Sequence, residues 1–141
     1  MPPISKTTKL VLCMTPLTSG TSTSDQASDA VDTTGFNGCR FMVTCGTAVG
    51  TGYGITAQAS TSTTVGDFAS FTTSITAAST VSNRVLSVDV YKPTKRYLRV
   101  ISTSTTTNDL GGVIAELYDP MVLPTTNGST SVAAEGFGIS T

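Results

Sequence analysis

The sequence has no histidine and no tryptophan, and only 12% of its 141 residues are charged. Histidine is the side chain whose pKa suits acid-base chemistry near neutral pH, and its imidazole is the commonest protein ligand for metals such as zinc and copper. We therefore predict that the protein is not an enzyme, and that it has no catalytic residue, no cofactor and no metal site.

An excess of positive charge is also missing. The formal net charge is −1 and the isoelectric point is near 5.1, whereas binding to a nucleic acid backbone requires a strongly basic surface. No apolar run approaches the ~20 residues of a membrane-spanning helix, and the short run 10–13 is too brief for a signal peptide. We expect synthesis in a cytoplasm and neither nucleic acid nor membrane as a direct partner.

Cysteine is scarce, and the three residues Cys13, Cys39 and Cys45 cannot all pair with one another. On a continuous strand, Cys39 and Cys45 would share a face but lie too far apart for a disulfide, at ~3.3 Å per residue. We predict three free thiols, as is typical of proteins from reducing compartments.

The composition is dominated by uncharged polar residues, since 28 Thr and 17 Ser together make up about a third of the chain. Threonine loses side-chain entropy in a helix and fits a pleated strand well, while serine competes with the helix backbone for hydrogen bonds. The sequence therefore favours strands and loops, and we predict an all-β fold.

Short runs with a period of two residues predict seven strands, separated by clusters of Gly, Asn, Pro, Ser and Thr. The predicted strands are 9–14, 39–47, 53–59, 67–76, 84–91, 96–102 and 113–118. Both faces of 39–47 are largely apolar, which favours a central position. The spacing predicts a single domain, 1–141, built as an antiparallel two-sheet sandwich over about 9–118, with a jelly roll preferred to an immunoglobulin-like topology.

Three connections complete this prediction. The polar stretch 19–32 reads as a solvated loop, with at most one helical turn. Asn37-Gly38 marks a turn. The segment 92–95 contains Pro93 and predicts a tight turn, so that 84–91 and 96–102 would form a β-hairpin.

Five of the eight basic residues lie within 16 positions on this predicted hairpin. They are Arg84, Lys92, Lys95, Arg96 and Arg99. One interpretation is a basic patch that binds an acidic protein surface. The other is an edge hairpin that uses its cations to prevent unwanted strand pairing. The two interpretations are compatible, and both stay open at this point.

The two ends of the chain predict extended arms, 1–9 and 119–141, because their prolines restrict the backbone and their apolar residues are too sparse for a separate core. Such arms gain order on a neighbouring molecule. The candidate partner-binding anchors of the second arm are Val122, Leu123, Phe137 and Ile139.

The segment 86–99, Leu-Ser-Val-Asp-Val-Tyr-Lys-Pro-Thr-Lys-Arg-Tyr-Leu-Arg, lies in a small Thr/Ser-rich chain without His or Trp. In this it resembles the decoration proteins of tailed bacteriophage heads, and more narrowly the jelly-roll cement proteins of short-tailed phages. The resemblance is densest over 84–102, and elsewhere it covers only length, composition and number of strands.

The resemblance implies a structural capsid decoration (cement) protein on the outer surface of the virion, made in the cytoplasm of the host bacterium. Its partners would be the phage major capsid protein, whose neighbouring subunits it clamps against the pressure of packaged DNA, and itself, as a homodimer first and a trimer second. The alternative is a receptor- or glycan-binding module of a phage fibre or spike, which the lack of Trp and the presence of only four Tyr make less favoured.

Overall fold

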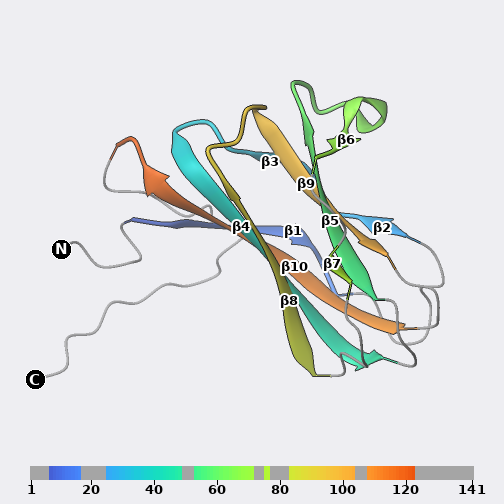
Figure 1. Ribbon diagram of the computed structural model, residues 1–141. Helices are drawn as coiled ribbons and strands as arrows, with labels where there is room; N and C mark the ends of the chain where they lie inside the picture. Colours follow the sequence, from blue (N-terminus) through green and yellow to red (C-terminus); the bar gives the residue numbers. More distant parts are fainter. Residues whose placement is uncertain are drawn as a thin grey trace, which may run out of the picture.

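Two antiparallel sheets packed against each other form the molecule (Figure 1). The computed structural model describes residues 7–16, 25–48, 53–71, 75–76, 83–103 and 108–122. The four-stranded sheet A has the order β1-β10-β4-β8, with β1 (Lys9–Met14), β10 (Asn108–Pro120), β4 (Phe36–Ala48) and β8 (Arg84–Tyr91). Sheet B is built on β9 (Tyr97–Thr103) and β5 (Gly54–Ser60), with β2 (Gln26–Ala27) and β3 (Val31–Asp32) on one side and β6 (Ala69–Ser70) and β7 (Ile75–Thr76) on the other. This architecture confirms the predicted all-β sandwich.

The core lies between the two sheets and is filled by every second residue of the long strands, as the period of two dictates. In β4, Phe41 and Val43 are completely buried, and in β9 Leu98 and Val100 face them from the other sheet. The remaining core residues are Cys13, Val31, Cys39, Cys45, Tyr53, Ile55, Ala57, Val88, Val90, Val113, Ala115 and Leu117. The prediction that β4 is a central strand is confirmed, because it pairs with β10 on one side and β8 on the other.

The predicted hairpin is wrong. Strand β8 pairs with β4 in sheet A, and β9 pairs with β5 in sheet B, so residues 92–96 cross from one sheet to the other. A short link normally signals a hairpin, but five residues also span up to ~17 Å, which is enough to cross the ~10 Å between stacked sheets. Lys92 takes a left-handed conformation with φ 51° at the start of this crossing.

The predicted solvated loop 19–32 is also wrong over the part that the structure describes, 25–32. Both β2 and β3 pair with β9, and Val31 is buried in the core. Between them, Ser28 replaces a regular strand pair: its N–H donates to the carbonyl of Val100 at 2.9 Å, and its hydroxyl accepts from the N–H of Val100 at 3.1 Å. A serine side chain can form a hydrogen bond with a neighbouring backbone in this way. A polar stretch can therefore pair with a strand although its sequence shows no period of two.

Two further local predictions need correction. The predicted strand 67–76 is broken into a 3₁₀ turn (η2, Val65–Asp67) and the short strands β6 and β7. The turn predicted at Asn37-Gly38 lies inside β4, and the chain turns earlier instead, where Gly35 has φ 87° and the N–H of Phe36 donates to the carbonyl of Thr33.

The last described strand is longer than predicted in both directions. β10 continues to Pro120, and the N–H of Met121 donates to the carbonyl of Gly35 at 2.8 Å, so the sandwich extends past the predicted boundary at 118. The predicted arms otherwise lie outside the described residues, apart from Thr7 and Thr8 before β1 and the segment 119–122.

Strand β10 carries a bulge at Gly111-Gly112, where its register with β4 shifts between Leu110 and Val113. A Cβ atom on Gly111 would overlap the side-chain oxygen and the carbonyl of Thr44 on β4. The bulge needs glycine because backbone and side chain of the neighbouring strand occupy the space that any side chain would take.

We expect Gly111→Ala to destabilise the protein by about 1–3 kcal/mol, because Thr44 must move to admit the methyl group. Urea unfolding measures the change. The control is Gly66→Ala in the 3₁₀ turn, where an added Cβ meets no heavy atom within 4 Å, so its stability should stay within about 0.5 kcal/mol of the native protein. Equal effects of both substitutions would contradict this account of the bulge.

Candidate interaction surface

The outer face of sheet A, which points away from the core, carries an apolar row across three strands. Register places Leu12 of β1 beside Ile114 of β10, and Ile114 beside Met42 of β4. Leu12 is 40% exposed and Ile114 is 37% exposed. We call these three residues the apolar row. Large apolar side chains that gather on an exposed sheet face are typical of a protein interaction surface.

A polar row runs beside the apolar row on the same face, two residues further along each strand. Glu116 of β10, Arg40 of β4 and Asp89 of β8 are successive neighbours in register. Arg40 forms an ion pair with Glu116, and this hydrogen-bonded carboxylate raises the pKa of the Arg40 guanidinium. This ion pair links β4 to β10 on the outer face.

Tyr118 connects the polar row to the end of the sheet. A Cβ on Gly38 would overlap the Tyr118 ring, so the ring lies directly over the glycine backbone. Its hydroxyl donates to Oδ1 of Asp89 at 2.7 Å, two strands away. Partial burial, together with the Asp89 carboxylate, raises the pKa of Tyr118 to about 12, which keeps the phenol protonated and donating.

These side chains border a shallow hollow of about 550 Å³ at the end of the outer face. Three carboxylates and one guanidinium line it, so its charge is negative overall. The lining residues are Thr7, Thr8, Arg40, Asp89, Glu116, Tyr118, Asp119 and Pro120.

The predicted basic cluster is divided between the two sheets, and two of its members are engaged within the molecule. Arg99 on β9 is only 8% exposed. Its guanidinium donates to Oε1 of Gln58 at 2.8 Å and to the carbonyl of Val65 at 3.2 Å, and it lies 4.3 Å from the centre of the Phe68 ring. Arg99 thus anchors the 3₁₀ turn to sheet B.

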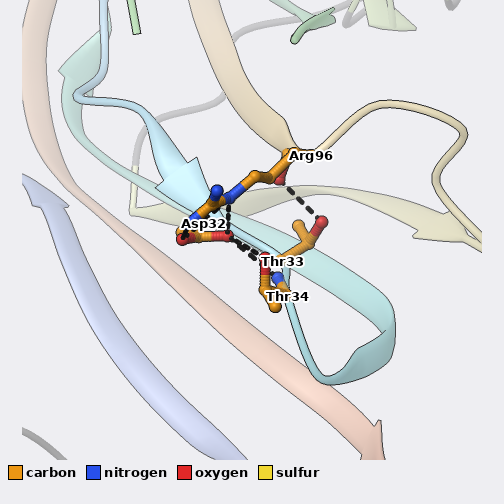
Figure 2. A network of polar contacts seen from close by, with 4 residues as sticks. All are labelled: Asp32, Thr33, Thr34 and Arg96. Atoms are coloured by element: carbon orange, nitrogen blue, oxygen red, sulfur yellow. Dashed lines mark hydrogen bonds and ion pairs between the residues drawn. The ribbon is translucent and has the colours of Figure 1, made fainter. Parts of the chain in front are cut away.

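Arg96 holds β3 to the crossing between the sheets (Figure 2). Its Nη2 donates to the Asp32 carboxylate at 2.7 Å and its Nε at 3.1 Å, while Thr33 donates its hydroxyl to the Arg96 carbonyl at 2.8 Å. Thr34 also donates its N–H and its hydroxyl to Asp32. These hydrogen bonds, led by those from Arg96, hold the pKa of Asp32 well below its ordinary value.

The other three basic candidates are exposed but do not form one patch. Arg84 is the first residue of β8, whereas Lys92 follows its last residue, with the Lys92 ammonium 5.4 Å from the centre of the Tyr91 ring. Lys95 borders a separate hollow of about 160 Å³ that also contains Phe71 and Pro93.

Of the four predicted anchors in the second arm, only Val122 lies within the described residues, where it is 78% exposed. Leu123, Phe137 and Ile139 lie outside them.

Candidate metal ligands and cysteine thiols were the other groups to consider in the part of the chain that the structure describes. Over those residues, no group of three or more His, Cys, Asp or Glu side chains could hold a metal ion, and no helix there is long and apolar enough to cross a membrane. The three cysteines are free, as predicted, and all are buried. Burial raises the pKa of Cys13 to about 12 and also raises those of Cys39 and Cys45, which suppresses the reactive thiolate.

The sequence reasoning did not single out the apolar row, although a signal for it was present. The runs 41–43 and 113–115 are continuously apolar instead of alternating. A strand in a two-layer sandwich buries one face against the other sheet, so a continuous apolar run gives the opposite face an apolar character as well.

Comparison with known proteins gives no relative from which to transfer a function. No protein-family model matches the chain, and no curated protein matches it at a significant level. The function must therefore be argued from the geometry of the chain itself.

The Asp32–Arg96 pair predicts a pH dependence of stability. Because the pKa of Asp32 is lowered in the folded state, its contribution is present above the unfolded pKa of ~3.9 and is lost as the pH falls through the folded value. At pH 7, Asp32→Asn should reduce the free energy of unfolding by about 0.5–1 kcal/mol, since the pair is exposed.

Chemical denaturation at several pH values measures this difference, which should shrink as the pH falls below about 4, because Asp32 then takes up a proton in the unfolded chain but not yet in the folded one. Asp25→Asn, at an exposed position before β2, is the control. A difference that grows on acidification would contradict the assigned ion pair.

Proposed function

We propose that the protein is a structural capsid decoration protein, which binds the outer surface of a phage head and clamps neighbouring subunits of the major capsid protein. The observation that carries the proposal is the outer face of sheet A, where an apolar row and an ion-paired polar row share one broad surface. This surface suits adhesion to another protein. We therefore propose a binding role without enzymatic activity.

The chemistry of the face indicates what it contacts. The apolar row (Leu12, Ile114 and Met42) fits apolar side chains of a capsid subunit. The negative hollow beside Tyr118 fits a lysine or arginine from the same subunit, held by carboxylates and by the face of the aromatic ring. The basic residues between Arg84 and Arg99 are a less suitable binding patch, because Arg96 and Arg99 already bond within the chain.

We also propose the jelly-roll form of the sandwich. Strands from the start of the chain pair in turn with strands from its end: β1 with β10, β2 and β3 with β9, β4 with β8, and β5 with β6 and β7. This nested pairing is what a long antiparallel ribbon produces when it is rolled into two sheets, and it supports the proposal.

Self-association and location follow from the same proposal. The protein would be made in the cytoplasm of the host bacterium and would act on the outer surface of the virion as a homodimer, with a trimer as the second possibility. Both arms remain candidate capsid-binding elements, with Val122, Leu123, Phe137 and Ile139 as the anchors of the second.

Copy number tests the role directly. A decoration protein covers the whole head, so gel densitometry of purified virions should give hundreds of copies per particle. A count between a few and some tens would support the alternative of a receptor- or glycan-binding module in a fibre or spike and would overturn the decoration proposal.

The binding face is tested by Leu12→Lys, which places a charge in the apolar row. Because Leu12 is 40% exposed on edge strand β1, the fold should survive, whereas affinity for heads that lack the protein should fall by about tenfold or more, since a buried apolar contact is replaced by a charge. Cosedimentation with such heads measures the affinity. The control Val65→Lys, at a 72% exposed residue of the 3₁₀ turn, should bind normally.

A further inference from the structure

We propose that two copies of the chain pair antiparallel through strand β8, about a two-fold axis that passes beside Val88, and so join their A sheets into one continuous sheet. The inference names the surface for the self-association that forms part of the proposed function. It is argued from the sheet edges of this chain, and its test does not involve a capsid.

In the described part of the chain, three of the four sheet edges carry features that oppose the addition of another strand. At the two edges of sheet B lie β2 with β3 and β6 with β7, each of only two residues. The β1 edge of sheet A begins with Lys9 and is interrupted by a register shift between Leu12 and Met14. Short strands, lysines and bulges are the usual means by which proteins protect an edge.

Strand β8 is not short and has no lysine and no bulge, and its one cation, Arg84, is its first residue. It is eight residues long, contains no proline and no lysine, and keeps an unbroken register with β4 from Arg84 to Tyr91. Within the described residues, no strand pairs with its second side. Two apolar side chains stand exposed on it, Val85 at 58% and Tyr91 at 60%. A long, regular and partly apolar edge is a template for strand pairing.

The sequence of β8 is complementary to itself in one antiparallel register. A two-fold axis beside Val88 places Val85 opposite the partner's Tyr91, which covers both exposed apolar side chains of each copy at once. On the core side of the sheet, Leu86 lies opposite the partner's Val90, and Val88 lies opposite the partner's Val88. Aromatic and β-branched residues that face each other across strands are among the favourable pairs.

The polar residues fit the same register. Ser87 lies opposite the partner's Asp89, so its hydroxyl can donate to that carboxylate. Asp89 already accepts the Tyr118 hydroxyl on Oδ1 at 2.7 Å, which leaves its other oxygen for the serine. Lys92 leaves the strand with φ 51°, so it does not come to lie against the partner's Arg84.

Neighbouring registers are worse. An axis beside Ser87 would bury the partner's Asp89 against Val85, and an axis beside Asp89 would place two carboxylates opposite each other, which is destabilising. An axis beside Leu86 would leave Tyr91 outside the paired segment. An axis between two residues would place residues of opposite faces across from each other, which a two-fold axis normal to the sheet does not allow.

The pairing has a consequence for the outer face. A two-fold axis normal to the sheet keeps the outer faces of both A sheets on the same side. The dimer would therefore present two apolar rows to one surface, and binding of the first row would raise the effective concentration of the second.

Solution self-association tests the edge. The native chain should show a concentration-dependent dimer by sedimentation equilibrium. Val85→Lys should raise the dissociation constant of this dimer at least about tenfold, because it removes both Val85–Tyr91 pairs, one on each side of the axis. The control Leu12→Lys, on the opposite edge of sheet A, should dimerise like the native chain. A native chain that stays monomeric, or Val85→Lys dimers as tight as native ones, would overturn the proposal.

Disulfide trapping tests the register. In Val88→Cys, the two new thiols face each other across the axis at the ~4.5–5.5 Å Cα separation of opposite residues and should form a disulfide-linked dimer on mild oxidation. In Ser87→Cys, the two new cysteines lie diagonally across the axis, with their Cα atoms more than about 7 Å apart, and should not form a disulfide. The native cysteines are buried, so they do not compete.

A cross-link at residue 87 without one at residue 88 would overturn the register. Dimers that cross-link at residue 88 and not at residue 87 but fail to bind heads would support the edge pairing and contradict the capsid proposal alone.

Discussion

The pairing of β4 with β10 is the contact on which the rest of the structure depends. These two thirteen-residue strands form the centre of sheet A, and their inner faces supply much of the core, including Phe41, Val43, Val113 and Leu117. Their close approach tolerates no side chain at Gly38, where the Tyr118 ring lies, or at Gly111, where Thr44 lies. The same pairing brings Met42 beside Ile114 and Arg40 beside Glu116 on the outer face. Core and candidate binding surface are thus two sides of one strand pair.

An apolar outer face is costly for a molecule that stays alone in water. Each partly exposed apolar side chain forgoes part of the ~25 cal/mol per Å² that burial would supply. The chain keeps Leu12 and Ile114 in this position while it buries two charged residues, Arg99 and Glu116, with specific partners. Such a distribution is physically reasonable when another protein surface covers the face, and it is the reason that the proposed function is adhesive.

The four sheet edges of the sandwich differ in how well they can accept a further strand. Sheet B ends in very short strands and β1 carries a bulge, while β8 remains long and regular. The edges therefore restrict where a further strand can add, and the outer face of sheet A determines which side chains the resulting assembly presents. A single face and a single edge of the same sheet account for both proposed partners, the capsid subunit and a second copy.

The sequence by itself determined the fold class and most of the long strands. The load of Thr and Ser excluded amphipathic helices, and alternation identified β1, β5, β8 and β9 to within a few residues, because each of these is a local property of the side chains. It also indicated the central position of β4 from its two apolar faces. The prediction of free thiols followed from the number and spacing of the cysteines.

Only the tertiary structure decided which strands are neighbours and which side chains remain available. Residues 92–96 are as suitable for a crossing between sheets as for a hairpin, so the separation of β8 from β9 depended on the partners that β4 and β5 offered. The basic cluster was divided for the same reason, with Arg96 and Arg99 bound to Asp32 and Gln58 from segments at least 41 residues away in the sequence. Pairing between distant strands is a property of the whole chain, and a local pattern of residues does not contain it.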